Sequence, residues 1–353
     1  MNENEVYSGN GNGNGNENEN ENPQANVSAN DPLCFKAASK IAAELLSEIK
    51  KVVLGKENEA ILLICALLSS SHVLIEDVPG VGKTTLASAL AKAAGLSFKR
   101  VQFTPDVMAS DITGFNIYNR QKETFEFREG VVMSNVLLAD EINRASPKTQ
   151  SALLEAMEEG RVTVDGDTYA LPSPFMVIAT QNPQGFVGTY PLPEAQLDRF
   201  ALKISLGYPT EEEELLIIKE RKTENPLDNV KAVSTEKRLV FTKKVVSSIT
   251  IDDEVLKYII SLVSATRGHS LLSSGASPRA SLALMRISRA YAFMNGRNFV
   301  RPEDVKNVYK KVLAHRITLS QEAKLAKTTA DAILNDILMH TPVPYKGAKK
   351  GEE

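Results

Sequence analysis

The sequence contains no tryptophan, only two cysteines and no long apolar run. Cys34 and Cys65 cannot form a metal site by themselves, and a buried reduced thiol is the ordinary expectation for Cys65 in the run ILLICALL. That run is too short to cross a bilayer, and the acidic, Asn-rich N-terminus lacks the basic and then apolar pattern of a signal peptide. We therefore expect a soluble, cytoplasmic protein with no membrane segment.

An excess of basic residues is also missing. The 353 residues include 41 Lys and Arg against 44 Asp and Glu, which gives a net charge of −3. A protein dedicated to binding duplexes would more often carry a basic excess, so nucleic acid is disfavoured as a partner. The histidines lack the spacing of metal ligands, and none is a site candidate: His72, His269, His315 and His340.

The most informative stretch is IEDVPGVGKTT, residues 75–85, which has the composition of a phosphate-binding turn. An apolar strand leads into a turn with glycines at Gly80 and Gly82, and a helix opens at Lys83. Backbone N–H groups and the helix dipole then favour a phosphate, which the Lys83 side chain can also reach, while the Thr84 hydroxyl can bind Mg²⁺. The expected nucleotide-binding residues here are Pro79, Gly80, Val81, Gly82, Lys83, Thr84 and Thr85.

A second stretch, NVLLADEINRA at residues 135–145, predicts a buried strand that ends in two carboxylates. In a parallel sheet these acids emerge at the carboxyl end, beside the phosphate-binding turn. Asp140 can then orient Mg²⁺-bound water, and Glu141 can polarise the water that attacks a γ-phosphate. A buried strand that merely ends in solvated acids is the alternative.

A third stretch, PFMVIATQNP at residues 174–183, is another β-branched strand with polar residues at its end. Asn182 is the candidate here, because an amide can hold the attacking water or the γ-phosphate by hydrogen bonds. An Asn before Pro183 is also a common turn residue, and both interpretations can hold at once.

Two later arginines complete the set of candidates. Arg199, in LPEAQLDRF, lies where it cannot easily fold back on its own phosphate-binding turn, and so is suited to a neighbouring subunit. Ser277 and Pro278 predict the start of a helix that has Arg279 in its first turn. Because Arg279 opposes the helix dipole there, we expect it to contact a γ-phosphate; a surface ion pair is the alternative.

The order of these motifs resembles the AAA+ ATPases, whose architecture is an α/β P-loop core with a parallel sheet followed by a small all-α lid. The phrases QFTPDVMASDITGF, LADEINRASPKTQSALLEAMEEG, ATQNP and YPLPEAQLDRF are similar to those of the MoxR family in particular. The resemblance runs from residue 52 to residue 316, and five motifs in a fixed order are far more specific than any one of them.

The resemblance implies a role for each candidate and adds an adenine-contacting segment at residues 53–55, with Val53 and Gly55. The implied roles are Walker A for Lys83 and Thr84, Walker B for Asp140 and Glu141, sensor 1 for Asn182, arginine finger for Arg199 and sensor 2 for Arg279, with Thr84 and Asp140 at Mg²⁺. By this resemblance Arg279 serves either its own subunit or the next one, and both alternatives stay open. One position departs from the Walker A pattern, because Asp77 stands where the first glycine is usual.

Composition along the chain predicts its organisation. Residues 1–31, rich in Asn, Gly and Glu, are expected to form a disordered leader, residues 32–208 the core, residues 209–345 the lid and residues 346–353 a tail. Helices are expected at residues 32–51, 147–159, 252–265, 277–294 and 302–317, and a hairpin at residues 161–171 around Asp165-Gly166. That hairpin is suited either to contacting a client or to packing on the core.

The resemblance implies an ATP hydrolase that uses ATP and Mg²⁺ and assembles as a homo-oligomeric ring, a hexamer. The implied output is chaperone-like remodelling or maturation of partner proteins, often with a von Willebrand factor A domain protein and in some cases for metal-cofactor insertion. The alternatives are a helicase-type motor that remodels DNA and a slow ATP-dependent assembly switch. The hairpin has two acids and only Arg161, which disfavours the first, and the presence of Glu141 and Arg199 disfavours the second.

Overall fold

The computed structural model describes residues 28–181, 190–220 and 225–344. Most of the expected leader, the whole tail and the sensor 1 candidate Asn182 lie outside the described residues. Among the described residues, no helix is long and apolar enough to span a bilayer.

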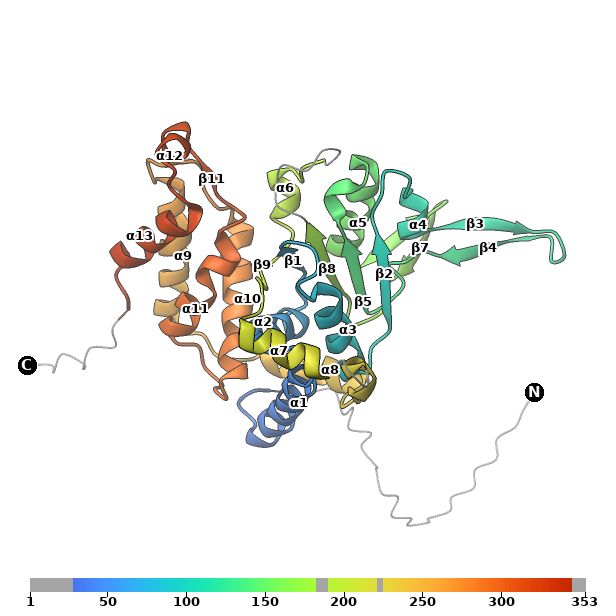
Figure 1. Cartoon of the computed structure of the whole chain (residues 1–353), viewed down its shortest axis with the longest axis horizontal. Helices are drawn as coiled ribbons and strands as arrows, with labels where there is room; N and C mark the ends of the chain where they lie inside the picture. The colour runs from blue at the N-terminus through green and yellow to red at the C-terminus, as the bar shows by residue number, and fades with distance from the viewer. Residues whose placement is uncertain (1–27, 182–189, 221–224, 345–353) are drawn as a thin grey trace, which may run out of the picture.

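A five-stranded parallel sheet with the order β2-β5-β8-β1-β9 forms the centre of the molecule (Figure 1). Its central strands are apolar and buried on both faces, so parallel pairing under covering helices is the arrangement they favour. The predicted α/β core is confirmed. The strands are β1 (Val73–Glu76), β2 (Phe98–Gln102), β5 (Val136–Asp140), β8 (Met176–Gln181) and β9 (Leu202–Ile204).

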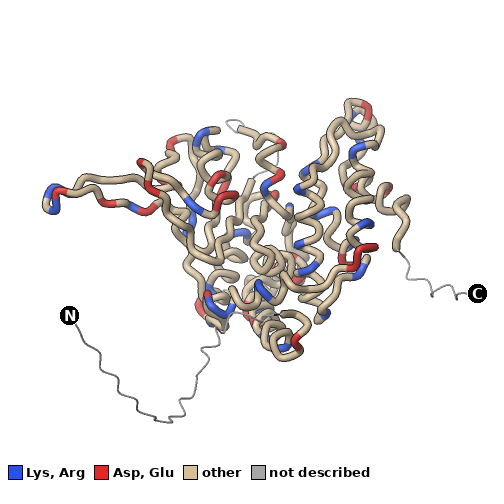
Figure 2. The backbone as a smooth tube through the Cα atoms, turned by 180° about the vertical axis from the view of Figure 1, so that it is seen from behind, with Lys and Arg blue, Asp and Glu red and all other residues tan. Residues whose placement is uncertain are grey.

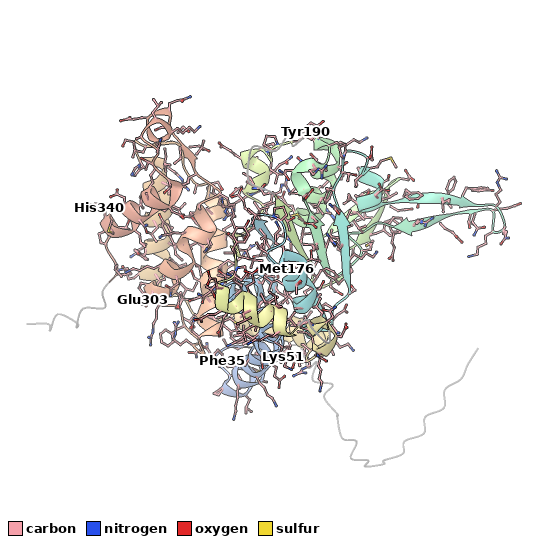
Figure 3. All side chains as sticks on the ribbon, viewed as in Figure 1. Phe35, Lys51, Met176, Tyr190, Glu303 and His340 are labelled. Atoms are coloured by element: carbon pink, nitrogen blue, oxygen red, sulfur yellow. The ribbon has the colours of Figure 1, made fainter. Side chains whose placement is uncertain are left out.

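Successive side chains of β1 enter two different apolar clusters, one on each face of the sheet. Val73 and Ile75 join the cluster made with helices α1, α2 and α3, whereas Leu74 joins the cluster made with helix α5. Figure 3 shows Met176, at the start of β8, within this interior. The core helices are α1 (Pro32–Lys50), α2 (Glu57–Leu68), α3 (Lys83–Ala94), α4 (Ala109–Thr113), α5 (Pro147–Glu159) and α6 (Glu194–Leu197), with the 3₁₀ turn η1 (Ile142–Arg144).

The ends of α3 and α5 follow from their capping residues. Gly95 and Gly160 adopt φ of 66° and 63° after the two helices, a left-handed conformation that glycine reaches without a steric penalty. The Ser146 hydroxyl accepts a hydrogen bond from Thr149 N at 3.3 Å and begins α5. The predicted start of α3 at Lys83 and the predicted bounds of α5 are confirmed.

Two hairpins extend from the core on the side of α5. Residues 114–129 form a long ribbon of β3 (Gly114–Asn119) and β4 (Thr124–Glu129), which projects from the body as an arm (Figure 1). The predicted second hairpin, β6 (Arg161–Val164) with β7 (Asp167–Ala170), is confirmed. The rings of Phe127 and Tyr169 stack with centroids 3.8 Å apart, so the second hairpin packs against the base of the arm.

The C-terminal part is mainly helical and lies beside the sheet (Figure 1). The three helices predicted there are confirmed as α9 (Asp253–Arg267), α10 (Pro278–Met294) and α11 (Pro302–Leu313). Figure 3 shows His340, at the end of the last helix, on the outer side of this group. The remaining elements are α7 (Glu211–Glu220), η2 (Pro226–Asn229), α8 (Glu236–Ser247), β10 (Leu272–Ser274), β11 (Thr318–Leu319), α12 (Gln321–Leu325) and α13 (Ala330–His340).

The core and the C-terminal helices share one apolar cluster. Leu45 of α1, Leu63 of α2, Leu239 of α8 and Leu284 of α10 are all buried in it. Acidic and basic residues are interspersed over both halves of the chain, and the arm has both signs (Figure 2), in keeping with the small net charge. The division at residues 208 and 209 stays a prediction.

Candidate nucleotide-binding site

The phosphate-binding turn lies at the carboxyl end of β1 and leads directly into α3. Gly80 and Gly82 adopt φ of 88° and 93°, which a residue with a side chain reaches only with strain. The Lys83 ammonium donates to the carbonyl oxygens of Asp77 at 2.8 Å and Val78 at 3.2 Å. Burial lowers the pKa of Lys83, and the carboxylates of Asp77, Asp140 and Glu141 oppose that shift.

One cleft of about 380 Å³ brings together most of the residues that the motifs predicted. It is lined by the turn, by the start of α3 and by the ends of β2 and β5. Lys83, Thr84, Asp140 and Glu141 therefore face one space, although two distant motifs supply them. The lining residues are Pro79, Gly80, Gly82, Lys83, Thr84, Thr85, Arg100, Gln102, Asp140 and Glu141.

Thr180 of β8 ties the two acidic residues together. Its hydroxyl donates to Asp140 Oδ1 at 2.5 Å and accepts from Glu141 N at 2.9 Å. Glu141 has a φ of 56°, a strained conformation for a glutamate that these contacts hold in place. Its carboxylate accepts from Arg144 Nη1 at 2.9 Å.

Arg100 is a residue of this cleft that the motifs did not identify. Its guanidinium donates to Asp140 Oδ2 at 2.7 Å from the neighbouring strand β2. Strand pairing places it there, because Gln102 is aligned with Asp140 and Arg100 lies two residues earlier on the same face. The phrase KRVQF alone contains no phosphate-binding pattern, so only the sheet order could have identified it.

The oxygen donors of the cleft suit Mg²⁺. One carboxylate from Asp140 and one hydroxyl from Thr84 line it, and Mg²⁺ is commonly held by one or two protein oxygens with phosphate oxygens and water in the other positions. Among the described residues, no cluster of three or more His, Cys, Asp or Glu side chains could hold a metal ion by itself. The donor set therefore fits a magnesium ion that arrives with a nucleotide.

A smaller, mainly apolar pocket adjoins the turn and contains the segment implied for adenine. Val53 lines it together with Val81 and Ile217, and its volume is about 130 Å³. Gly55 has a φ of 70°, and a methyl group added there would lie 1.6 Å from Glu213 Oε1 at the start of α7. The Glu213 carboxylate is the end of a flexible side chain and can move aside, so the positive φ, rather than the pocket lining, is what favours glycine at residue 55.

Asp77, the departure from the Walker A pattern, is a structural anchor. It is 6% exposed, and its Oδ2 accepts from Leu206 N at 2.5 Å, Gly207 N at 2.8 Å and Ser205 Oγ at 3.1 Å. These bonds join the start of the phosphate-binding turn to the segment that leaves β9 for α7. A glycine at residue 77 could not make them.

The two predicted arginines meet at the opposite end of the sheet. Arg199 precedes β9, and Arg279 lies in the first turn of α10. Both guanidinium groups form ion pairs with the Glu158 carboxylate in the last turn of α5, one with each oxygen. Sequence motifs gave no sign of Glu158, since its partners lie 41 and 121 residues away.

Asp198 attaches this arginine pair to the C-terminal helices. Its Oδ1 accepts from Arg316 Nε at 2.7 Å, and its Oδ2 accepts from the Ser277 hydroxyl at 2.7 Å. The Arg316 side chain is only 2% exposed and also donates to the Phe200 carbonyl at 2.8 Å. The position of Arg279 is therefore linked to that of Arg199 through a partly buried network.

Parallel strands separate the two groups of residues. The turn lies after β1, whereas Arg199, Arg279 and Glu158 line a pocket of about 340 Å³ that also contains His72, directly before β1. Four residues of extended chain span roughly 13 Å, so the two arginines face away from the cleft of their own chain. The candidate residues of the described part of the chain thus form two groups at opposite ends of one sheet.

Comparisons with known proteins identify the family to which this fold belongs. A model described as the ATPase family associated with various cellular activities (AAA) matches residues 72–202, and an AAA lid domain model matches residues 264–337. The uncharacterized protein YeaC of Bacillus subtilis is 48% identical over 306 residues, which are 87% of this chain and 96% of YeaC. A crystal structure of a presumed ATPase from Cytophaga hutchinsonii, 40% identical, has a TM-score of 0.83 and covers 89% of this chain and 98% of its own.

The protein named Chaperone MoxR1 of Mycobacterium tuberculosis is 39% identical over 326 residues, which are 88% of this chain and 86% of MoxR1. The core and lid models match in the order in which the sheet and the helical group follow one another. On this likeness, and with the sheet and the cleft that it requires, the chain belongs to the MoxR family of AAA+ ATPases.

Proposed function

We propose that this protein hydrolyses ATP at sites shared between identical subunits of a ring and uses the resulting motion to remodel partner proteins. The observation that carries the proposal is the split of the candidate residues between the two ends of the sheet. A subunit whose phosphate cleft and arginines face opposite ways can complete the site only with a second copy. Such head-to-tail contacts generate a closed ring when the rotation between successive subunits closes, and a hexamer is the ring that the family resemblance implies.

In this proposal the cleft binds the nucleotide. Lys83 exchanges its carbonyl partners for the β- and γ-phosphates, Thr84 and Asp140 hold Mg²⁺, and the pocket beside Val53 receives the adenine. Bound Mg²⁺ would neutralise charge on the phosphate oxygens. Glu141, fixed by the bond from its N–H to Thr180, polarises the attacking water, and Asn182 holds that water or the γ-phosphate.

The arginines act on the nucleotide of the neighbouring subunit. Arg199 would stabilise the charge that spreads over the transferring phosphoryl group, as an arginine finger does. Arg279 pairs with Glu158 in the same pocket as Arg199. This position favours action of Arg279 on the nucleotide of the neighbouring subunit rather than on that of its own subunit. The network through Asp198 would couple both arginines to movement of the C-terminal helices.

The proposed output is chaperone-like. The name of the Mycobacterium tuberculosis relative, Chaperone MoxR1, supports remodelling of proteins. The projecting arm exposes aromatic side chains, among them Tyr118 at 50% and Phe125 at 72%, which suits contact with an unfolded or partly folded client. A von Willebrand factor A domain protein as partner, and maturation of partners that includes metal-cofactor insertion, are further parts of this proposal.

The experiment that tests the proposal measures ATPase activity per subunit against protein concentration, with molecular mass by light scattering alongside. We expect specific activity to rise as rings form. We also expect Arg199→Ala to bind nucleotide and assemble while losing about 10³-fold or more in turnover, because an arginine finger supplies that much of the rate. Activity that is flat with concentration, together with normal turnover of Arg199→Ala, would overturn the shared site.

A further inference from the structure

The contact that carries a further inference is the double ion pair of Glu158. One oxygen of this carboxylate pairs with Arg199 and the other with Arg279, so a single anion bridges two guanidinium groups. A terminal phosphate also presents several oxygens to arginines in this way, and guanidinium groups recognise both anions through the same paired N–H bonds. Glu158 therefore stands where the proposed function would put a phosphate.

The local structure gives Glu158 little other reason to be acidic. It lies in the last turn of α5, where the helix dipole disfavours negative charge, and no basic residue of that turn compensates it. Its side chain is 38% exposed, so the pair adds little to the stability of the fold. Its evident contacts are the two arginines.

We propose that Glu158 is a positioning residue that holds Arg199 and Arg279 together in the separate subunit, and that the terminal phosphate of ATP on a second copy displaces it during assembly. This inference rests on the proposed function, because it needs ATP at a shared site. Glu158 lies between two positively charged guanidinium groups that would otherwise repel each other. Displacing Glu158 costs the free energy of the two ion pairs, and this cost opposes assembly.

Other contacts hold Arg199 and Arg316 in the pocket when Glu158 moves away. Arg199 Nη1 also donates to the Leu154 carbonyl at 3.0 Å, and Arg316 is held by Asp198. Arg286, two turns after Arg279 on α10, lines the same pocket and has no ion pair within the described part of the chain. Four arginines and two carboxylates, Glu158 and Asp198, line the pocket. Once Glu158 has moved away, only Asp198 offsets the four positive charges, so an incoming triphosphate meets a net positive surface.

The test compares Glu158→Gln with Glu159→Gln. Glu159 is the next residue, loses the same charge on substitution and pairs at 3.2 Å with the exposed Arg161 instead of the arginine pair. Assembly is measured by light scattering against protein concentration in the full chain carrying Glu141→Gln, so that ATP is not consumed. The midpoint is determined once with ATP and Mg²⁺ and once with ADP and Mg²⁺.

We expect Glu158→Gln to lower the ATP midpoint about 3- to 10-fold, since two half-exposed ion pairs no longer compete with the phosphate. The ADP midpoint and both midpoints of Glu159→Gln should stay at the parent value. Equal ATP midpoints for the two variants, a rise with Glu158→Gln, or an equal fall with ADP would overturn the inference.

The same series separates this inference from the proposed function. If the wild-type chain hydrolyses ATP with a concentration-dependent rate and Glu158→Gln assembles like Glu159→Gln, only the role of Glu158 fails. If the wild-type chain neither hydrolyses ATP nor assembles with it, the proposed function fails, and the role of Glu158 fails with it.

Discussion

The two ends of the central sheet differ in how their side chains are held. At the carboxyl end, Lys83, Asp140 and Glu141 contact backbone groups and near neighbours in the sheet, such as Thr180. At the amino end, Arg199 and Arg279 are held by Glu158 and, through Asp198, by the C-terminal helices. The first end is a preformed cleft, to which we propose that a phosphate binds, whereas at the second end a carboxylate of the same chain pairs with both arginines. The difference explains why one subunit would contain both parts of a site and still be unable to use them together.

The largest expected effect is on turnover at the carboxyl end, where a substitution of Glu141 should impair ATP hydrolysis without impairing nucleotide binding. Glu141→Gln should lower turnover by about 10² to 10⁴, the usual contribution of a general base, because the amide cannot accept the proton of the attacking water. Its nucleotide affinity should stay near the wild-type value, since Lys83 and the turn are intact. Steady-state turnover and binding of a fluorescent ATP analogue measure the two quantities; equal turnover in variant and wild type would remove Glu141 from the proposal.

Acid should lower the free energy of unfolding through His72, which lies directly before β1 at the amino end of the sheet. Its Nδ1 accepts a hydrogen bond from Val177 N at 3.0 Å, and Nε2 lies 3.1 Å from the Met157 carbonyl, so the folded state holds the neutral ring. Burial lowers the pKa of His72 from 6.5 to about 4. The unfolded chain therefore takes up the proton first, and stability should fall by up to about 3 kcal/mol as the pH drops from about 6.5 to 4.

Urea unfolding of the wild type and of His72→Gln at a series of pH values measures this effect. The variant should be less stable at neutral pH but should lose less stability across the acid range, because residue 72 no longer takes up a proton. His315, whose pKa burial also holds well below 6.5, should leave a remaining slope in both proteins. Identical slopes would show that His72 does not contribute.

Asp77, directly after β1, gives the smaller effect on stability. Asp77→Asn should lower the free energy of unfolding by about 2 kcal/mol, because a charge-assisted acceptor of two backbone N–H groups is replaced by a neutral amide. Glu76→Gln is the matched control, since the Glu76 pair with Lys203 is more exposed and should contribute about 1 kcal/mol or less. A control variant that is as destabilised as Asp77→Asn would contradict the anchoring role.

Local sequence was sufficient to predict which residues meet at the carboxyl end of the sheet. The turn, Lys83, Thr84 and Asp140 occur in short phrases whose strand and helix signals are strong, and parallel pairing then brings their ends together. The same signals predicted the start of α5 at Ser146 and of α10 at Ser277.

The amino end could be predicted only in part. Its two arginines were identified as candidates, but the Glu158 that joins them is 121 residues from Arg279, and no local pattern reports a contact at that separation. The anchoring role of Asp77 could not be predicted, because the N–H groups that donate to its carboxylate, Leu206 N and Gly207 N, lie about 130 residues away, after the neighbouring strand β9. The sequence did contain two signals for these contacts: Glu158 is an acidic residue in the last turn of a helix, and Asp77 is an acidic residue where a glycine is usual.

The most direct test of the proposed shared site mixes two variants that are each expected to be inactive, Glu141→Gln and Arg199→Ala. Each should hydrolyse ATP very slowly alone, since every shared site lacks one half. In an equal mixture about a quarter of the head-to-tail interfaces would combine an intact Glu141 with an intact Arg199, so about that share of wild-type activity should return. A mixture no more active than its components, although light scattering shows mixed rings, would contradict the shared site.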